Sequence, residues 1–104
     1  AFGEQRRLEL ARAVAAKPRL LFLDEPAAGM NQDEIRDLEK RIRSLKKQGI
    51  TIILVEHVMD LVMGVTDRIA VLNFGSKICE GNPKVIQKNV DVQEAYLGRS
   101  EEDD

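Results

Sequence analysis

The chain has 104 residues, of which 43% are hydrophobic and 33% are charged, and its formal net charge at pH 7 is −2. This composition is typical of one globular domain with a modest core. The weakly acidic charge and the 4% aromatic content argue against nucleic acid as a partner, because that binding depends on clustered basic charge and on stacking. One cysteine excludes an internal disulfide, and one histidine argues against a structural zinc site.

The two ends of the chain suggest a piece of a longer protein. The sequence begins with Ala1 rather than Met, and it has no basic region followed by an apolar core and a cleavage site, so we expect no signal peptide. The longest apolar stretch, Ile50 to Val55, is too short for a membrane span. We expect a reducing compartment, the cytoplasm, and an acidic disordered tail over residues 99–104.

The first part of the chain predicts a helix followed by a strand. Strong helix formers over Glu4 to Ala16 predict a helix that Pro18 ends. The run Leu20 to Leu23 is apolar without alternation, which is typical of a strand that is covered on both faces.

A second helix and a second strand follow. Asn31 and Glu34 form the pattern of a capping box, and apolar residues then repeat at helical spacing up to Gly49. The stretch ITIILVEH, residues 50–57, is rich in β-branched residues and predicts a strand. Since one helix connects the two strands, we expect them to be parallel and the fold class to be α/β.

The remaining chain predicts short elements. Met59 to Val65 reads as a short helix, and two strands are expected around a turn at Asn73 to Ser76. Pro83 to Lys88 and Val92 to Leu97 are expected to form short helices.

Both predicted strands of the first half end in ionisable residues. Asp24 and Glu25 follow the first strand, and Glu56 and His57 close the second. Ligands bind outside the carboxyl ends of parallel strands, so one rim could gather three carboxylates and an imidazole. Asp24 suits magnesium, which prefers oxygen ligands. Glu25 points elsewhere because strand side chains alternate, and it is left to accept a proton from water.

Plainer interpretations stand beside these. Asp24 and Glu25 could be solvated residues that open a loop, and His57 could hydrogen-bond a terminal phosphate or simply cap the next helix. Arg6, Arg7 and Arg12 could form an anion patch, but a solvated helix face explains them better. Gly3 before a helix offers backbone N–H groups to a phosphate, which is a weak signal.

Together these segments resemble the C-terminal half of the nucleotide-binding domain of ABC transporters, a P-loop NTPase fold. The resemblance lies in AFGEQRRLELARAVAAKPRLLFLDEP, then AAGMN, then TIILVEH, in the family's order, and it covers residues 1–98. It implies that Asp24 coordinates magnesium through water, that Glu25 polarises the hydrolytic water and that His57 contacts the γ-phosphate. It also implies that Ala28 to Asn31 form the loop that communicates across a dimer, with Asn31 where aspartate is usual.

Ala1 to Glu4 resemble the signature segment, which contacts ATP held by the opposite subunit. Against the family pattern Leu-Ser-Gly-Gly-Gln, Ala1 stands at the serine, Phe2 at the first glycine, Gly3 at the second and Glu4 at the glutamine. The serine hydroxyl is therefore missing. The phosphate loop G-x-x-x-x-G-K-S/T is also absent from the 104 residues, so we expect the chain alone not to hydrolyse ATP.

Within the family, DEPAAGMN, GEQRRLELARA and VQEAYLG are most similar to ATPase subunits of branched-chain amino acid importers, with the lipopolysaccharide-export ATPase as an alternative. The resemblance implies ATP and Mg²⁺ as cofactors, a head-to-tail dimer with a second ATPase subunit, and permease subunits at the cytoplasmic face of the membrane. A non-catalytic interaction module is the rival from a different class. Since upstream strands are missing, we also expect self-association or marginal stability.

Overall fold

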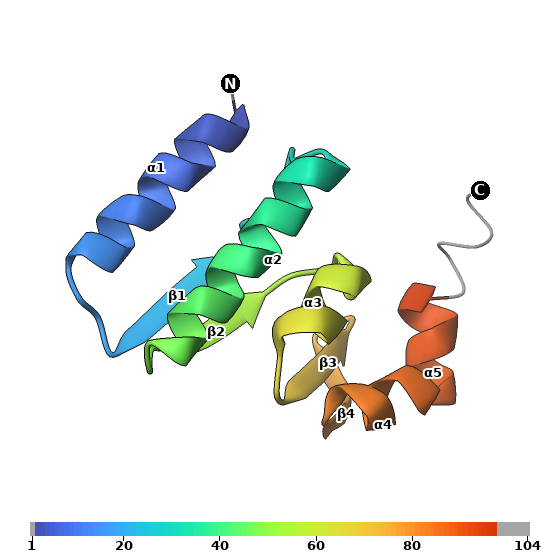
Figure 1. Cartoon of the computed structure of the whole chain (residues 1–104). Helices are drawn as coiled ribbons and strands as arrows, with labels where there is room; N and C mark the ends of the chain where they lie inside the picture. The colour runs from blue at the N-terminus through green and yellow to red at the C-terminus, as the bar shows by residue number, and fades with distance from the viewer. Residues whose placement is uncertain (1, 98–104) are drawn as a thin grey trace. The chain divides into compact units, whose positions relative to one another are not determined.

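The computed structural model describes residues 2–97, with side chains from Glu4 to Tyr96. Its elements follow the order α1, β1, α2, β2, α3, β3, β4, α4, α5, η1 (Figure 1). The chain divides between Leu61 and Val62 into two compact units. Over residues 2–97, no helix is both long enough and apolar enough to span a membrane.

The first unit contains a parallel pair of strands joined by a helix. Strand β1 (Leu20–Asp24) pairs with β2 (Thr51–Val55) in a register that sets Leu20 opposite Thr51 and Asp24 opposite Val55. Helix α2 (Gln32–Lys47) lies between them in the sequence and is seen in front of the strands in Figure 1. The predicted α/β fold class and the parallel pairing are confirmed, and both strands therefore end at the same rim.

Helix α2 begins and packs as its sequence predicts. The Asn31 side chain accepts a hydrogen bond from the Glu34 N–H at 2.9 Å, and the Glu34 carboxylate accepts one from the Asn31 N–H at 3.1 Å. This reciprocal capping box satisfies two donors that a helix start leaves open. Leu38, Ile42 and Leu45 then form the buried stripe of the helix.

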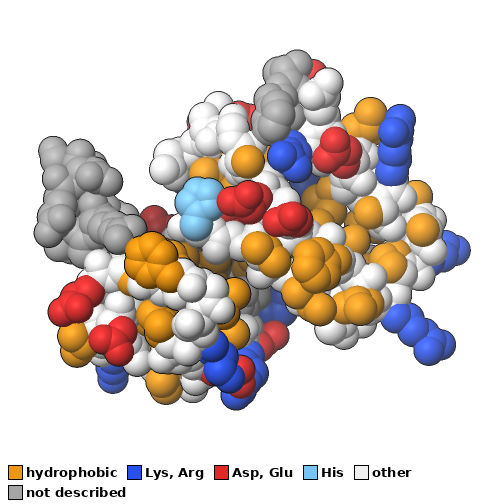
Figure 2. Space-filling model, turned by 180° about the vertical axis from the view of Figure 1, so that it is seen from behind, with side chains coloured by type: hydrophobic (Ala, Val, Ile, Leu, Met, Phe, Trp, Pro, Cys, Tyr) orange, Lys and Arg blue, Asp and Glu red, His pale blue; other side chains and the backbone are white. Residues whose placement is uncertain are grey.

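The prediction that β1 is covered on both faces is wrong. Leu21 is only 6% exposed, whereas its neighbour Phe22 is 61% exposed. Strand side chains alternate, so a sheet covered by helices on one side leaves every second residue open. Four exposed side chains make up this open sheet face: Leu20, Phe22, Ile53 and Val55. Seen from behind, apolar side chains gather over the two strands (Figure 2).

Helix α1 (Phe2–Ala15) begins earlier than predicted. Phe2 and Gly3 already belong to its first turn, so they do not form a segment that precedes the helix. The first helical turn leaves N–H groups without intrahelical partners. The helix ends before Lys17, whose φ of 53° lies in the left-handed region next to Pro18.

Helix α3 (Met59–Val65) leads into the second unit, which is built on a hairpin. Strand β3 (Ile69–Asn73) pairs antiparallel with β4 (Ser76–Gly81), and the register shifts between Val71 and Leu72. The two-residue loop of Phe74 and Gly75 has positive φ at both positions, 51° and 79°, as a tight hairpin turn requires. The predicted hairpin is confirmed.

Three short elements complete the second unit. Helix α4 (Pro83–Lys88) is confirmed and is capped by Asn82, whose side chain accepts from the Val85 N–H. The predicted helix over Val92 to Leu97 is only partly right, because α5 (Val90–Val92) gives way to a π-helical turn, η1 (Gln93–Leu97). In that turn the Tyr96 hydroxyl donates to the Leu72 carbonyl of β3, a tertiary bond that local sequence does not predict. The predicted acidic tail, residues 99–104, lies outside the described residues.

Candidate functional site

The backbone at the end of β1 turns sharply at Glu25. Its N–H donates to the Val55 carbonyl at 2.7 Å, which extends the pairing with β2 by one bond beyond Asp24. Its φ of 47° is uncommon for a residue other than glycine, and such conformations cluster at functional sites. The N–H of Ala28 donates back to the Glu25 carbonyl at 3.2 Å, so a turn follows at once.

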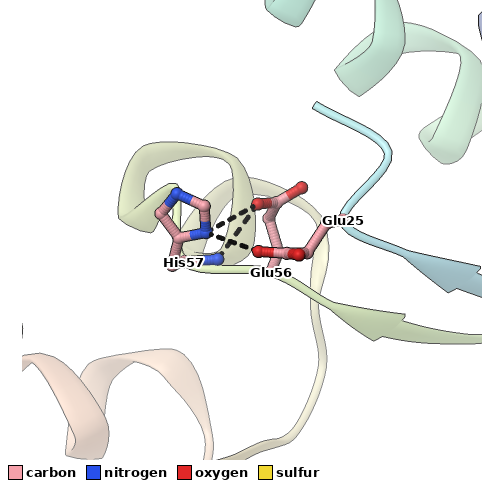
Figure 3. Close-up of side chains that lie close together, drawn as sticks. All are labelled: Glu25, Glu56 and His57. Atoms are coloured by element: carbon pink, nitrogen blue, oxygen red, sulfur yellow. Dashed lines mark hydrogen bonds and ion pairs between the residues drawn. The ribbon is translucent and has the colours of Figure 1, made fainter. Parts of the chain in front are cut away.

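Glu25 and His57 meet at the rim where the two strands end. The Glu25 Oε1 lies 3.1 Å from the His57 Nδ1, and a Glu56 oxygen lies 3.5 Å from the same nitrogen (Figure 3). Ionised carboxylates only accept hydrogen bonds, so with both ionised Nδ1 carries the proton. The second ring nitrogen, Nε2, points away from both carboxylates (Figure 3). Both Glu25 and His57 are more than half exposed, so the pair is accessible to a ligand.

Glu56 is the third member of this rim cluster, which we define as Glu25, Glu56 and His57. Its side chain is 0% exposed, although its backbone is partly accessible. One carboxylate oxygen accepts the Ala27 N–H at 3.1 Å and the other accepts the His57 N–H at 3.0 Å. The sequence pattern predicts Glu56 among the carboxylates of the rim but indicates no role for it.

A signal for the burial of Glu56 was present in the sequence. In ITIILVEH, residues 52, 54 and 56 lie on one face because strand side chains alternate. Ile52 and Leu54 occupy the covered face, and Glu56 continues it. A carboxylate on a covered face must be hydrogen-bonded, and this requirement identifies it as a residue with a specific task.

Asp24 is next to the cluster but does not join it. It is the last residue of β1, it is exposed, and by alternation it shares the open sheet face with Phe22. Its carboxylate accepts no hydrogen bond from any residue in the described range, so its oxygens are accessible. An accessible carboxylate at the end of a strand fits Mg²⁺, which is bound through one or two carboxylates and keeps several waters.

The other predicted site residues lie apart from the cluster. Phe2, Gly3 and Glu4 occupy the first turn of α1, and Asn31 uses its side chain to cap α2. The Asn31 side chain bonds the Glu34 N–H, whereas the Glu25 carboxylate contacts His57. Ala1 lies outside the described residues.

A cavity of about 280 Å³ opens between α1, β1 and α2 and does not include the rim cluster. Asp24 borders it, together with charged side chains of both helices. Those charges are paired: Asp37 lies 2.9 Å from Arg41 and 3.5 Å from Arg7. The hydrogen bond from Arg41 lowers the pKa of the Asp37 carboxyl. Arg6 is near Glu9 at 3.8 Å, so Arg6 and Arg7 behave as paired surface charges.

Comparisons with known proteins identify the family to which the sequence is similar. Residues 1–28 match the profile described as ABC transporter, and residues 76–102 match that of a branched-chain amino acid ATP-binding cassette transporter. The chain is 48% identical over 101 residues to the high-affinity branched-chain amino acid transport ATP-binding proteins BraF of Pseudomonas aeruginosa and LivG of Escherichia coli. The match covers 96% of this chain but only 40% of each relative.

Solved structures give the same fold. A nucleotide-free ATP-binding cassette from an ABC transporter superposes with a TM-score of 0.81 at 29% identity, over 92% of this chain and 40% of that one. CbiO1 of Clostridium perfringens, part of the ABC transporter complex cbiONQ, superposes with a TM-score of 0.73 at 33% identity. The match covers 98% of this chain and 43% of that one. The chain therefore belongs to the ATP-binding proteins of ABC transporters and corresponds to part of their ATP-binding domain.

Proposed function

We propose that the whole protein containing this chain hydrolyses ATP to energise the import of branched-chain amino acids. One structural observation carries the enzymatic part: Glu25 Oε1 and His57 Nδ1 lie 3.1 Å apart at the carboxyl ends of two adjacent parallel strands. The names of the relatives BraF and LivG support the class of solute.

The residues at the rim have distinct roles in this proposal. Asp24 holds Mg²⁺ through water, and the ion, when bound, neutralises charge on the phosphate oxygens. Glu25 accepts a proton from the attacking water through Oε2, since Oε1 accepts from His57. His57 presents Nε2 to the terminal phosphate, in agreement with its direction away from both carboxylates (Figure 3).

The remaining predicted residues act across a dimer in this proposal. Ala1, Phe2, Gly3 and Glu4 contact ATP held by a second ATPase subunit arranged head to tail, and the start of α1 offers backbone N–H groups for that contact. Asn31 belongs to the loop between the subunits. Permease subunits bind the dimer at the cytoplasmic face of the membrane. CbiO1 is part of a multi-subunit transporter complex, which supports this kind of assembly.

The 104-residue chain alone is expected to be inactive. It contains no G-x-x-x-x-G-K-S/T loop, whose backbone amides and lysine hold the β- and γ-phosphates in P-loop NTPases. Mg²⁺-dependent ATP turnover by the purified chain would contradict this expectation.

A second candidate is export of lipopolysaccharide. The LptB protein of Acidithiobacillus ferridurans, of the lipopolysaccharide export system, is 35% identical over 96 residues, against 48% for BraF and LivG. A non-catalytic interaction module is the remaining alternative. Transport assays with the full complex separate import from export, and ATP turnover separates both from the module.

The substitution Glu25→Gln in the full-length protein tests the proposal. It keeps the shape of the side chain but removes the proton acceptor, so we expect turnover to fall by about 100-fold or more while ATP binding persists. The matched control is Glu39→Gln, because Glu39 pairs with Arg43 on α2 away from the rim. Unchanged turnover in Glu25→Gln would exclude Glu25 as the base.

A further inference from the structure

We propose that Glu56 is a positioning residue, whose buried carboxylate fixes the backbone on both sides of the contact between Glu25 and His57. This inference rests on the proposed ATPase function, and it gives a task to a side chain that the function described above does not use. Three features support it: the burial of Glu56, the hydrogen bonds that the chain makes just after β1, and the orientation of the imidazole.

The burial of the Glu56 side chain is complete, with 0% of it exposed. A carboxylate removed from water is costly unless it is hydrogen-bonded. Both of its oxygens are bonded, and both donors are backbone N–H groups, those of Ala27 and His57. Hydrogen bonds from backbone N–H groups to an ionised carboxylate are stronger than neutral ones. Since each oxygen has a backbone donor, the Glu56 carboxylate is arranged as a structural brace.

The bond from the Ala27 N–H to the Glu56 carboxylate takes the place of a further main-chain hydrogen bond between the two strands. The pairing of β1 with β2 ends with the bond from the Glu25 N–H to the Val55 carbonyl. Pro26 has no N–H to donate, so the next donor along the chain is that of Ala27. In the structure this N–H reaches the Glu56 carboxylate, not a main-chain carbonyl of the neighbouring segment. Glu56 therefore ties down the chain immediately after Glu25, where the backbone holds an uncommon φ of 47°.

The bond from the His57 N–H to the Glu56 carboxylate fixes the backbone of His57, the partner of Glu25. The Glu56 oxygen that accepts the His57 N–H also lies 3.5 Å from the imidazole Nδ1 (Figure 3). Two carboxylates thus lie near Nδ1 on the same side of the ring, which holds Nδ1 toward the carboxylates and leaves Nε2 directed away from them (Figure 3). One side chain therefore sets the backbone after Glu25, the backbone of His57 and the direction of the ring.

The substitution Glu56→Gln in the full-length protein tests this inference. Glutamine has the same size but only one acceptor oxygen, so its NH₂ group must face one of the two backbone donors. We expect kcat for ATP to fall by roughly 10- to 100-fold while KM changes less than about twofold, because Glu25 and His57 are displaced and the nucleotide contacts made by all other residues are kept. The matched control is Glu39→Gln, which makes the same chemical change in the pair with Arg43 on α2, where the Glu39 side chain is 23% exposed. A kcat in Glu56→Gln within about twofold of the wild type would overturn the inference.

A spectroscopic measurement separates this inference from the proposed function. In protein isotopically labelled in alanine and histidine, we expect the amide signals of Ala27 and His57 and the ring signal of His57 to move in Glu56→Gln and to stay in place in Glu39→Gln. If the wild-type protein does not hydrolyse ATP, the proposed function fails, and these signals alone decide the inference: movement supports it and unchanged signals overturn it. If Glu56→Gln does not fold, hydrogen exchange in the wild type decides. Slow exchange of the Ala27 amide supports the brace, and exchange as fast as in an unstructured chain overturns it.

Discussion

The two sheets of the molecule carry the same kinds of charged groups in different surroundings. At the end of the parallel pair, the Glu56 carboxylate is buried and bonded to two backbone donors. On the antiparallel pair, Glu80 of β4 has a side chain that is 35% exposed, and its partners are the side chains of Arg68 and Lys77. Only the buried carboxylate fixes the backbone. Burial and the type of donor, rather than the presence of opposite charges, therefore distinguish the candidate site from ordinary surface pairing.

The largest effect on stability is expected from Glu56→Ala. This substitution removes the acceptor of two backbone N–H groups, that of Ala27, which is partly buried, and that of His57, which is exposed. We expect the free energy of unfolding of the full-length protein to fall by about 1–3 kcal/mol, mostly from the loss of the Ala27 bond. Denaturant titration of both proteins measures the loss. A loss below about 1 kcal/mol would mean that water or another group replaces the carboxylate as acceptor. The Glu56 carboxylate would then contribute no more to stability than an exposed surface pair such as that of Glu80.

A smaller effect is expected at the open sheet face. Phe22 is 61% exposed among other apolar side chains, so copies of the 104-residue chain have an apolar surface through which to associate. We expect Phe22→Lys to weaken self-association by about tenfold, as measured by sedimentation over a range of concentrations. Phe74→Lys is the control in the second unit, because Phe74 is exposed at a hairpin turn. A wild-type chain that stays monomeric at high concentration would contradict the prediction.

The smallest effect is expected from Glu80→Gln. Hydrogen bonds from Arg68 and then from Lys77 lower the pKa of the Glu80 carboxyl in the folded protein. A lowered folded-state pKa contributes stability above the unfolded pKa, and this contribution is lost as the pH falls through the folded value. Glu80→Gln should therefore lower the melting temperature slightly at pH 7 and not at all in strong acid. High salt should remove the difference at pH 7, since the groups are exposed to solvent. A large effect that resists salt would refute the description of a surface pair.

Much of the fold follows from local patterns. The capping box at Asn31, the helical repeat of α2 and the turn at Phe74 and Gly75 each depend on a few neighbouring residues, and all three are present. The open face of β1 was not predicted. An apolar run indicates that a strand can be buried, but it does not indicate whether other elements cover both of its faces. The π-helical turn contains Tyr96, whose hydroxyl donates to the Leu72 carbonyl, and local sequence does not predict a bond between residues so far apart in the chain.

The candidate site was predictable to a similar extent. That Asp24, Glu25 and His57 stand at one rim follows from parallel pairing, and the register confirms the pairing. The role of Glu56 did not follow, because it depends on where the Ala27 N–H points after Pro26. Sequence alternation gave the face of Glu56 but no information about its partners.

The connection from Glu25 to α2 is fastened at both ends, by Glu56 at Ala27 and by Glu34 at Asn31. Because the segment is short and hydrogen-bonded at both ends, it is expected to move as a rigid unit and not to deform internally. A displacement of the first turn of α2 would consequently also displace the carboxylate of Glu25. Two carboxylates, those of Glu56 and Glu34, each accept a hydrogen bond from a backbone N–H and so couple the start of this helix to the rim.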